Sequence, residues 1–162
     1  MGIRLGGLVM ADALSEIAGS SARALPGASL PVLREVPLFA GLSDRHLRKV
    51  GKLAMLASYP AGVAIVREGT RGHDFFVILE GEAAVTPRGG PVAKLAAGDH
   101  FGEMALLDRR PRSATVATET AMTALRIPGS AFQKLLRREP TIALALLETL
   151  SVRVRDLESH RR

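Results

Sequence analysis

The most informative segment of the sequence is residues 101–115, which read Phe-Gly-Glu-Met-Ala-Leu-Leu-Asp-Arg-Arg-Pro-Arg-Ser-Ala-Thr. Within it, residues 103–107 predict a short, strongly apolar helical turn in a region that otherwise reads as strands. Gly102 precedes this turn, so backbone N–H groups at its start can approach an anion closely. Glu103, however, puts a carboxylate at the place where that anion would bind. A site for a bare phosphate would avoid this negative charge.

A ligand that carries both a phosphate and a hydroxyl accounts for this combination of charges. The backbone amides and Arg112 would bind the phosphate, because a guanidinium makes charge-assisted hydrogen bonds to phosphate oxygens. Glu103 would accept a hydrogen bond from a sugar hydroxyl. In the alternative interpretation, Glu103 compensates the helix dipole and forms a structural ion pair with Arg112. The residues alone leave both interpretations open.

Around this segment, short apolar runs separated by glycine turns predict β-structure over about residues 60–127. The runs occupy residues 63–66, 75–79, 83–85, 92–95, 114–117 and 122–127. Strands of about five residues at this spacing are typical of an antiparallel sandwich or barrel. We therefore expect a mainly β fold of the α+β class.

Helical periodicity flanks the strands on both sides. Apolar residues predict one helix over about 42–57, with Ser43 or Asp44 as its N-cap and Tyr59-Pro60 as its stop. The first 31 residues, rich in Gly, Ala and Ser, predict a flexible or weakly helical arm whose weak helical stretch covers about 10–17.

After the strands, two further helices are expected over about 129–138 and 141–159. The last one carries an apolar stripe of Ile142, Leu146, Leu150 and Val154 at i, i+4 spacing. This stripe is longer than a small barrel needs to cover itself. It predicts a lid over a ligand, a dimer seam or both.

Composition excludes several classes of protein. The chain has 162 residues, of which 47% are hydrophobic and 23% charged, which fits one folded domain. It contains no cysteine, so disulfides, thiolate metal sites and cysteine nucleophiles are excluded. No apolar run reaches the ~18 residues that span a bilayer, and no secretory signal is present, so we expect a cytoplasmic protein without membrane insertion. The net charge is +6, but aromatic residues make up only 4%, too few to stack single-stranded nucleic acid.

Residues 101–106 and 111–115 resemble the phosphate-binding cassette of cyclic-nucleotide-binding domains, the family of the catabolite activator protein, kinase A regulatory subunits and cyclic-nucleotide-gated channels. The family pattern is Phe-Gly-Glu-(apolar)-Ala-Leu, a variable stretch, and then Pro-Arg-(Ser/Thr/Ala)-Ala-Thr. Residues 36–39 and 75–81 are similar to the family's entry segment and central strand. The resemblance covers about residues 32–158. It implies a β-sandwich jelly roll flanked by N-terminal and C-terminal helices, with residues 32–162 as the binding domain.

The resemblance implies a role for each cassette residue. Glu103 would bind the ribose 2′-hydroxyl, and Arg112 would bind an exocyclic phosphate oxygen. Gly102 and the backbone amides of Met104 and Ala105 would cap the phosphate. These roles agree with the physical interpretation of a ligand with a phosphate and a hydroxyl.

The resemblance also implies which residues lie near the purine. Ser113 occupies the position that influences the choice of purine in the family, and its hydroxyl permits cGMP without demanding it. Arg153 falls where channel-type bacterial members carry a basic residue that reaches the purine. In the alternative interpretation, Arg153 is an ordinary solvated arginine. Leu150, Val154 and Leu157 are the other candidate lid or seam residues.

Metal and enzyme chemistry are not indicated. The four histidines, His46, His73, His100 and His160, are scattered, and a cupin-type site would need a second histidine where Gly102 stands, so no metal is expected. No P-loop, dinucleotide fingerprint or nucleophile elbow is present. We therefore expect no enzyme activity and no cofactor other than the ligand.

These observations predict a regulatory module that binds a 3′,5′-cyclic nucleotide, cAMP rather than cGMP, with the last helix closing over the purine. Its partner would be an effector domain, another protein, or a second copy bound through the C-terminal helix. One alternative is a DNA-binding regulator of the catabolite-activator type that lacks its helix-turn-helix in this chain, so direct sequence-specific DNA binding is not expected. Another is a protein-interaction scaffold with a vestigial pocket.

Overall fold

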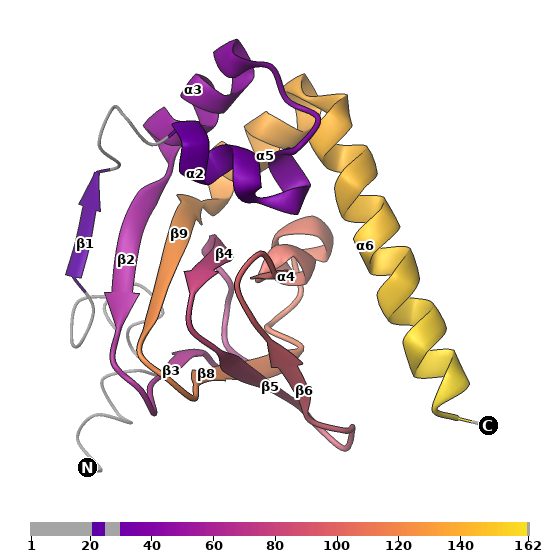
Figure 1. Ribbon diagram of the computed structural model, residues 1–162. Helices are drawn as coiled ribbons and strands as arrows, with labels where there is room; N and C mark the ends of the chain where they lie inside the picture. The colour runs from indigo at the N-terminus through magenta and orange to yellow at the C-terminus, as the bar shows by residue number, and fades with distance from the viewer. Residues whose placement is uncertain (1–20, 25–29, 162) are drawn as a thin grey trace.

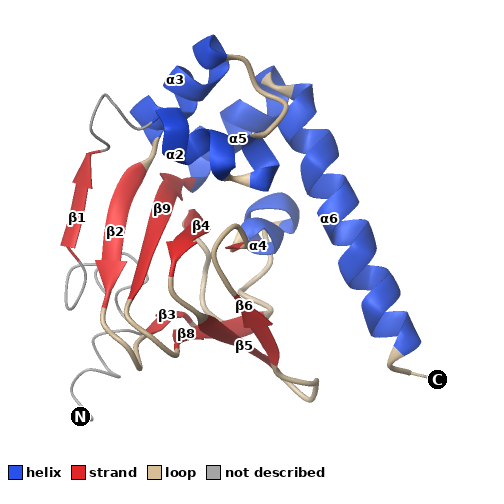
Figure 2. Ribbon diagram, viewed as in Figure 1, coloured by secondary structure: helices blue, strands red, loops and turns tan. Residues whose placement is uncertain are grey.

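The computed structural model describes residues 21–24 and 30–161 of the chain. The weak helical stretch expected over about 10–17 therefore lies outside the described residues. Nine described strands form two sheets in which every pairing is antiparallel. The sheets pack as a β-sandwich with helices at its N-terminal and C-terminal sides (Figure 2), which confirms the expected fold class.

The larger sheet has the strand order β1 (Ser21–Ala24), β2 (Met55–Tyr59), β9 (Met122–Pro128), β4 (Asp74–Glu80) and β7 (His100–Phe101). The smaller sheet has the order β3 (Ala64–Val66), β8 (Ala114–Thr118), β5 (Ala83–Pro87) and β6 (Ala93–Leu95). The helices are α2 (Leu30–Glu35), α3 (Asp44–Leu53), α4 (Glu103–Asp108), α5 (Gly129–Arg138) and α6 (Pro140–Ser159), together with the 3₁₀ helix η1 (Pro37–Phe39).

The central strand β4 is buried on both faces. Phe76 and Ile78 belong to the core between the two sheets, whereas Phe75 and Val77 belong to the core between the larger sheet and the helices. Phe75 stacks on Phe132 of α5 with ring centroids 4.2 Å apart. The uninterrupted apolar run of β4 thus reflects burial on two sides, as expected for a strand that does not face solvent.

The helices gather at one end of the molecule, and α6 extends away from them. In Figure 1, α2, α3 and α5 lie together over one end of the larger sheet. α6 begins beside α5 and runs down one side of the molecule, past α4. The two C-terminal helices expected over about 129–138 and 141–159 run over Gly129–Arg138 and Pro140–Ser159.

The prediction of one helix over about 42–57 is wrong in its last four residues. Ser43 does cap α3, since its Oγ accepts a hydrogen bond from the backbone N–H of His46. The helix ends at Leu53, because Ala54 is already extended with ψ 147°, and β2 follows. Ala57 and Tyr59, two positions apart, are buried between the sheets, which is the spacing of a strand.

The prediction of a flexible arm through residue 31 also needs correction. Residues 21–24 form β1, which pairs with β2 at the edge of the larger sheet, with Arg23 opposite Leu56. α2 begins at Leu30, and Leu33 is buried in the helical core. The described part of the arm therefore adds an edge strand and the first two residues of α2 to the domain.

Candidate functional site

The loop that leads into α4 depends on Gly102. This residue has φ 93°, in the left-handed region that favours glycine. A Cβ at this position would lie 2.8 Å from the carbonyl oxygen of Asp74 and 2.8 Å from Arg112 Nη1. Glycine is therefore required by both backbone conformation and packing, and it brings the start of α4 against β4 and Arg112.

Arg112 is buried behind this loop. Its Nη1 donates to the Gly102 carbonyl oxygen and its Nη2 to the Asp74 carbonyl oxygen, both at 3.0 Å. Gly72 makes room for the guanidinium, because a Cβ there would lie 2.8 Å from Arg112 Cζ and 2.7 Å from the Cβ of Ala105. These contacts fix Arg112 beside the first turn of α4, so the structure brings together Gly102, Ala105 and Arg112 of the predicted site.

Glu103, the first residue of α4, is 1% exposed. Its Oε2 lies 3.3 Å from His100 Nδ1, and its Oε1 lies 2.5 Å from Arg153 Nη1. Burial raises the pKa of Glu103, but the hydrogen bond and the electrostatic interaction with His100, together with the positive charge of Arg153, outweigh it, so the pKa lies below its ordinary value of 4.5. Glu103 is therefore an ionised, buried hydrogen-bond acceptor at neutral pH.

Arg153 comes to this site from α6. Besides Glu103, it contacts the carbonyl oxygen of His100, to which its Nη2 donates at 2.8 Å. The arginine expected near a purine therefore contacts the carboxylate expected to bind the ribose. Of the other candidate lid residues, Leu150 packs partly buried against the helical core, whereas Val154 and Leu157 are exposed.

Ser113 and Met104 lie together on the outer side of α4. Both are exposed, and Ser113 Oγ donates a weak hydrogen bond to Met104 Sδ at 3.6 Å. The far end of α4 is held by α5, since Gln133 Nε2 donates to the Leu106 carbonyl oxygen at 2.8 Å. All six predicted cassette residues thus belong to one compact group around α4.

Sequence reasoning missed the supporting residues Gly72, Asp74 and His100. Asp74 supports Arg112 through its backbone carbonyl oxygen, and Gly72 does so by having no side chain. Neither role leaves a clear signal in a sequence. His100 lies three residues before Glu103, but it belongs to β7 and Glu103 to α4, so the helix rule for neighbours three residues apart does not apply and the spacing does not predict their contact.

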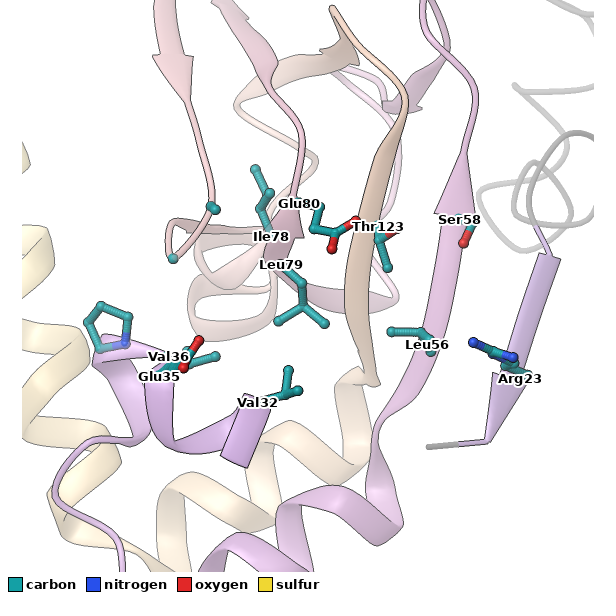
Figure 3. Close-up of a pocket in the computed structure, with 13 residues that line it drawn as sticks. Arg23, Val32, Glu35, Val36, Leu56, Ser58, Ile78, Leu79, Glu80 and Thr123 are labelled. Atoms are coloured by element: carbon teal, nitrogen blue, oxygen red, sulfur yellow. The ribbon is translucent and has the colours of Figure 1, made fainter. Parts of the chain in front are cut away.

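Cavities formed by the residues that the structure describes border the helices, and they include a larger and a smaller one. The larger, of about 630 Å³, lies on the outer face of the larger sheet beside α2 and contains none of the predicted site residues. Figure 3 shows Val32, Leu56 and Leu79 around it. A smaller cavity, of about 300 Å³, lies between η1, the turn before β7 and α6, and is lined by His100 and Arg153 among others.

The described residues hold neither a candidate metal cluster nor a membrane-spanning helix. No three His, Asp or Glu side chains gather there in a group that could hold a metal ion. Over the same residues, no helix has the length and apolar character needed to cross a membrane.

Comparison with known proteins gives consistent matches. The family model of the cyclic nucleotide-binding domain matches residues 56–139. The chain is 42% identical over 106 residues to the cAMP-dependent protein kinase regulatory subunit of Neurospora crassa, an alignment that covers 64% of this chain and 28% of that protein. The chain spans about a third or less of the length of the curated relatives it matches.

Solved structures agree with this match. The regulatory domain of Toxoplasma gondii PKA, crystallised with cAMP, is 29% identical with a TM-score of 0.68, over 75% of this chain and 48% of that one. A cyclic nucleotide-binding domain from Methylobacillus flagellatus has a TM-score of 0.76 at 21% identity, over 89% of this chain and 87% of that one. The second likeness bears on the fold alone.

Proposed function

Because the chain belongs to the cyclic nucleotide-binding domain family, we propose that it is a regulatory module that binds a 3′,5′-cyclic nucleotide, cAMP in preference to cGMP. It is not an enzyme, since the family is one of binding domains and the curated relatives are regulatory subunits. The observation that carries the proposal is that two buried charged residues meet at the start of α4: Glu103 is its first residue, and Arg112 donates to the carbonyl oxygen of Gly102 just before it.

We assign the phosphate to Arg112 and the start of α4. Two hydrogen bonds to backbone carbonyls orient the Arg112 guanidinium, whose planar fork of N–H donors suits the oxygens of a phosphate. Gly102 would let the phosphate approach the amides of Met104 and Ala105 without a clash. The buried position of Arg112 supports this role, because a phosphate there would be shielded from water and bound more strongly.

We assign the ribose 2′-hydroxyl to Glu103. A carboxylate only accepts hydrogen bonds when ionised, and the lowered pKa keeps Glu103 ionised at neutral pH. Each carboxylate oxygen can accept more than one hydrogen bond, so a hydroxyl can be accommodated beside the existing partners or in place of one of them. Ser113, exposed at the outer side of α4, would lie toward the base.

We propose that α6 is the element through which the ligand acts. Arg153 joins α6 to the same carboxylate that the ribose would bind, so a nucleotide at Glu103 changes the energy of this contact. If α6 has an open and a closed position, the free energy that couples it to the ligand can be no larger than the difference in ligand-binding free energy between these two positions. This contact therefore supports a movement of α6 that is linked to nucleotide binding. We expect the helix to close over the purine.

The partner that α6 would control is an effector domain or protein, or a second copy of the chain. Leu144, Leu147, Val154 and Leu157 are exposed along α6, which is the apolar surface that a helix-to-helix seam needs. Sedimentation velocity of the full chain with and without cAMP tests the second copy. A dimer that Leu147→Glu abolishes supports the seam, and a monomer at every concentration points to a separate effector.

Calorimetric titration of the full chain tests the binding proposal directly. We expect saturable binding of cAMP at one site, weaker binding of cGMP, and no binding of linear 5′-AMP at the same concentrations. The linear nucleotide has a more highly charged phosphate and no 3′ linkage, so it controls for general attraction to a basic chain. Absence of any cAMP binding would contradict the proposal.

A further inference from the structure

His100 is a buried partner of the carboxylate to which we assign the ribose. It is 4% exposed and lies in β7, two residues before Gly102. Its Nδ1 lies 3.3 Å from Glu103 Oε2, and Glu103 is an ionised acceptor. A hydrogen bond between them therefore requires a proton on His100 Nδ1, whatever the state of Nε2.

The two partners of Glu103 differ in how firmly they are held. His100 is fixed by the sheet, since β7 pairs with β4 and the imidazole lies 5.5 Å from the ring of Phe75. Arg153 reaches Glu103 from α6, and its side chain is 37% exposed. Glu103 thus has one fixed partner on Oε2 and one exchangeable partner on Oε1.

The two ring nitrogens of His100 differ in their hydrogen bonding, since only Nδ1 contacts Glu103. Nε2 is buried and has no hydrogen-bond partner among the residues that the structure describes. A buried polar atom without a partner is unfavourable. The ring is therefore held in place by its Nδ1 hydrogen bond and its apolar surroundings, and a phenylalanine would fill nearly the same space without the donor.

We propose that His100 is the positioning residue for the ribose-binding carboxylate. By holding Oε2, it sets the plane of the Glu103 carboxylate and directs Oε1 to the 2′-hydroxyl when Arg153 yields. It also keeps Glu103 ionised when the arginine charge is withdrawn. The inference rests on the proposed function and adds to it a residue that increases selectivity for a ribose over a 2′-deoxyribose by orienting Glu103.

The test compares cAMP with 2′-deoxy-cAMP in calorimetry on the full chain. The wild type should bind cAMP more tightly, and His100→Phe should reduce this affinity ratio by about tenfold, the effect of one lost hydrogen bond to a charged group. His100→Asn should restore most of the ratio, because its amide nitrogen occupies the place of Nδ1. His73→Phe, a change at an exposed histidine, should leave the ratio unchanged.

A measurement on the wild type covers the case in which His100→Phe does not fold. Long-range ¹H–¹⁵N spectra should show His100 Nδ1 protonated both without nucleotide and with cAMP. An unprotonated Nδ1, or a folded His100→Phe variant that keeps the wild-type ratio, overturns the inference. If the wild type binds neither nucleotide, the proposed function fails instead, and the spectrum alone decides whether His100 donates to Glu103.

Discussion

Arg153 of α6 donates a hydrogen bond from Nη1 to Oε1 of Glu103 across 2.5 Å, although the two residues are 50 positions apart in the sequence. The same guanidinium donates to the carbonyl oxygen of His100. The contact joins the last helix to the first residue of α4. It makes the position of α6 depend on what else binds the Glu103 carboxylate.

Removing the Arg153 side chain should loosen the second half of α6. The final turns of this helix have few buried apolar residues, so the contact with Glu103 and His100 is a main restraint there. We expect Arg153→Ala to accelerate amide hydrogen exchange over residues 150–158. Arg155→Ala, a change at an exposed arginine of the same helix, serves as the control and should have little effect. Equal exchange in the two variants would mean that Arg153 does not restrain α6.

The stability contributed by ionised Glu103 should depend on pH. A carboxylate whose pKa is lowered on folding stabilises the fold at pH above its unfolded value, and this contribution is lost as the pH falls through the folded pKa. We expect the wild type to be more stable than Glu103→Gln at neutral pH. The difference should shrink steadily as the pH falls below 4.5, because protonated Glu103 resembles glutamine.

Urea unfolding of both proteins across this pH range measures the difference. Other carboxylates titrate in both proteins and cancel. Glu148→Gln, at an exposed position of α6, provides a matched control that should show no such trend. A difference that grows on acidification would contradict the assignment of a lowered pKa to Glu103.

Gly102→Ala should be more destabilising than a change at a glycine that has only an unusual backbone conformation. Gly89 has φ 68° and open space within 4 Å of the place where a Cβ would lie, whereas a Cβ at Gly102 meets a backbone oxygen at 2.8 Å. Gly89→Ala should therefore lose about 1–2 kcal/mol from conformation alone. Gly102→Ala should lose more in urea unfolding and should also weaken nucleotide binding. Equal losses would show that the loop adjusts without strain.

The compact site was predictable because most of it lies in one continuous segment. Gly102, Glu103 and Arg112 lie within eleven residues of one another, on the short helix α4 and the segments that flank it, so they can be recognised together in the sequence. The contacts that fix Arg112 against Asp74 and Gly72 come from a distant segment and could not be predicted. The contact between Arg153 and Glu103 depends instead on the angle at which α6 leaves α5 and runs down one side of the molecule (Figure 1). Periodicity places Arg153 on a helix but carries no information about that angle.

The missed strand β2 has a different cause. Residues 53–57 contain apolar side chains whose spacing fits both a helix and a strand, and the sequence lacks a glycine or proline at the boundary after Leu53. Pairing with β9, and with β1 on the other side, selects the strand. Such tertiary pairing cannot be read from local propensity.

The central claim is that Arg112 binds the phosphate of a cyclic nucleotide, and calorimetric titration of Arg112→Ala with cAMP tests it most directly. Arg110→Ala is the matched control, since Arg110 is exposed in the same loop. Unfolding curves establish that each variant is folded before titration. We expect Arg112→Ala to weaken cAMP binding by roughly 1.5–3 kcal/mol, about tenfold or more, and Arg110→Ala to leave it nearly unchanged. A folded Arg112→Ala variant that binds cAMP as tightly as the wild type would contradict the claim.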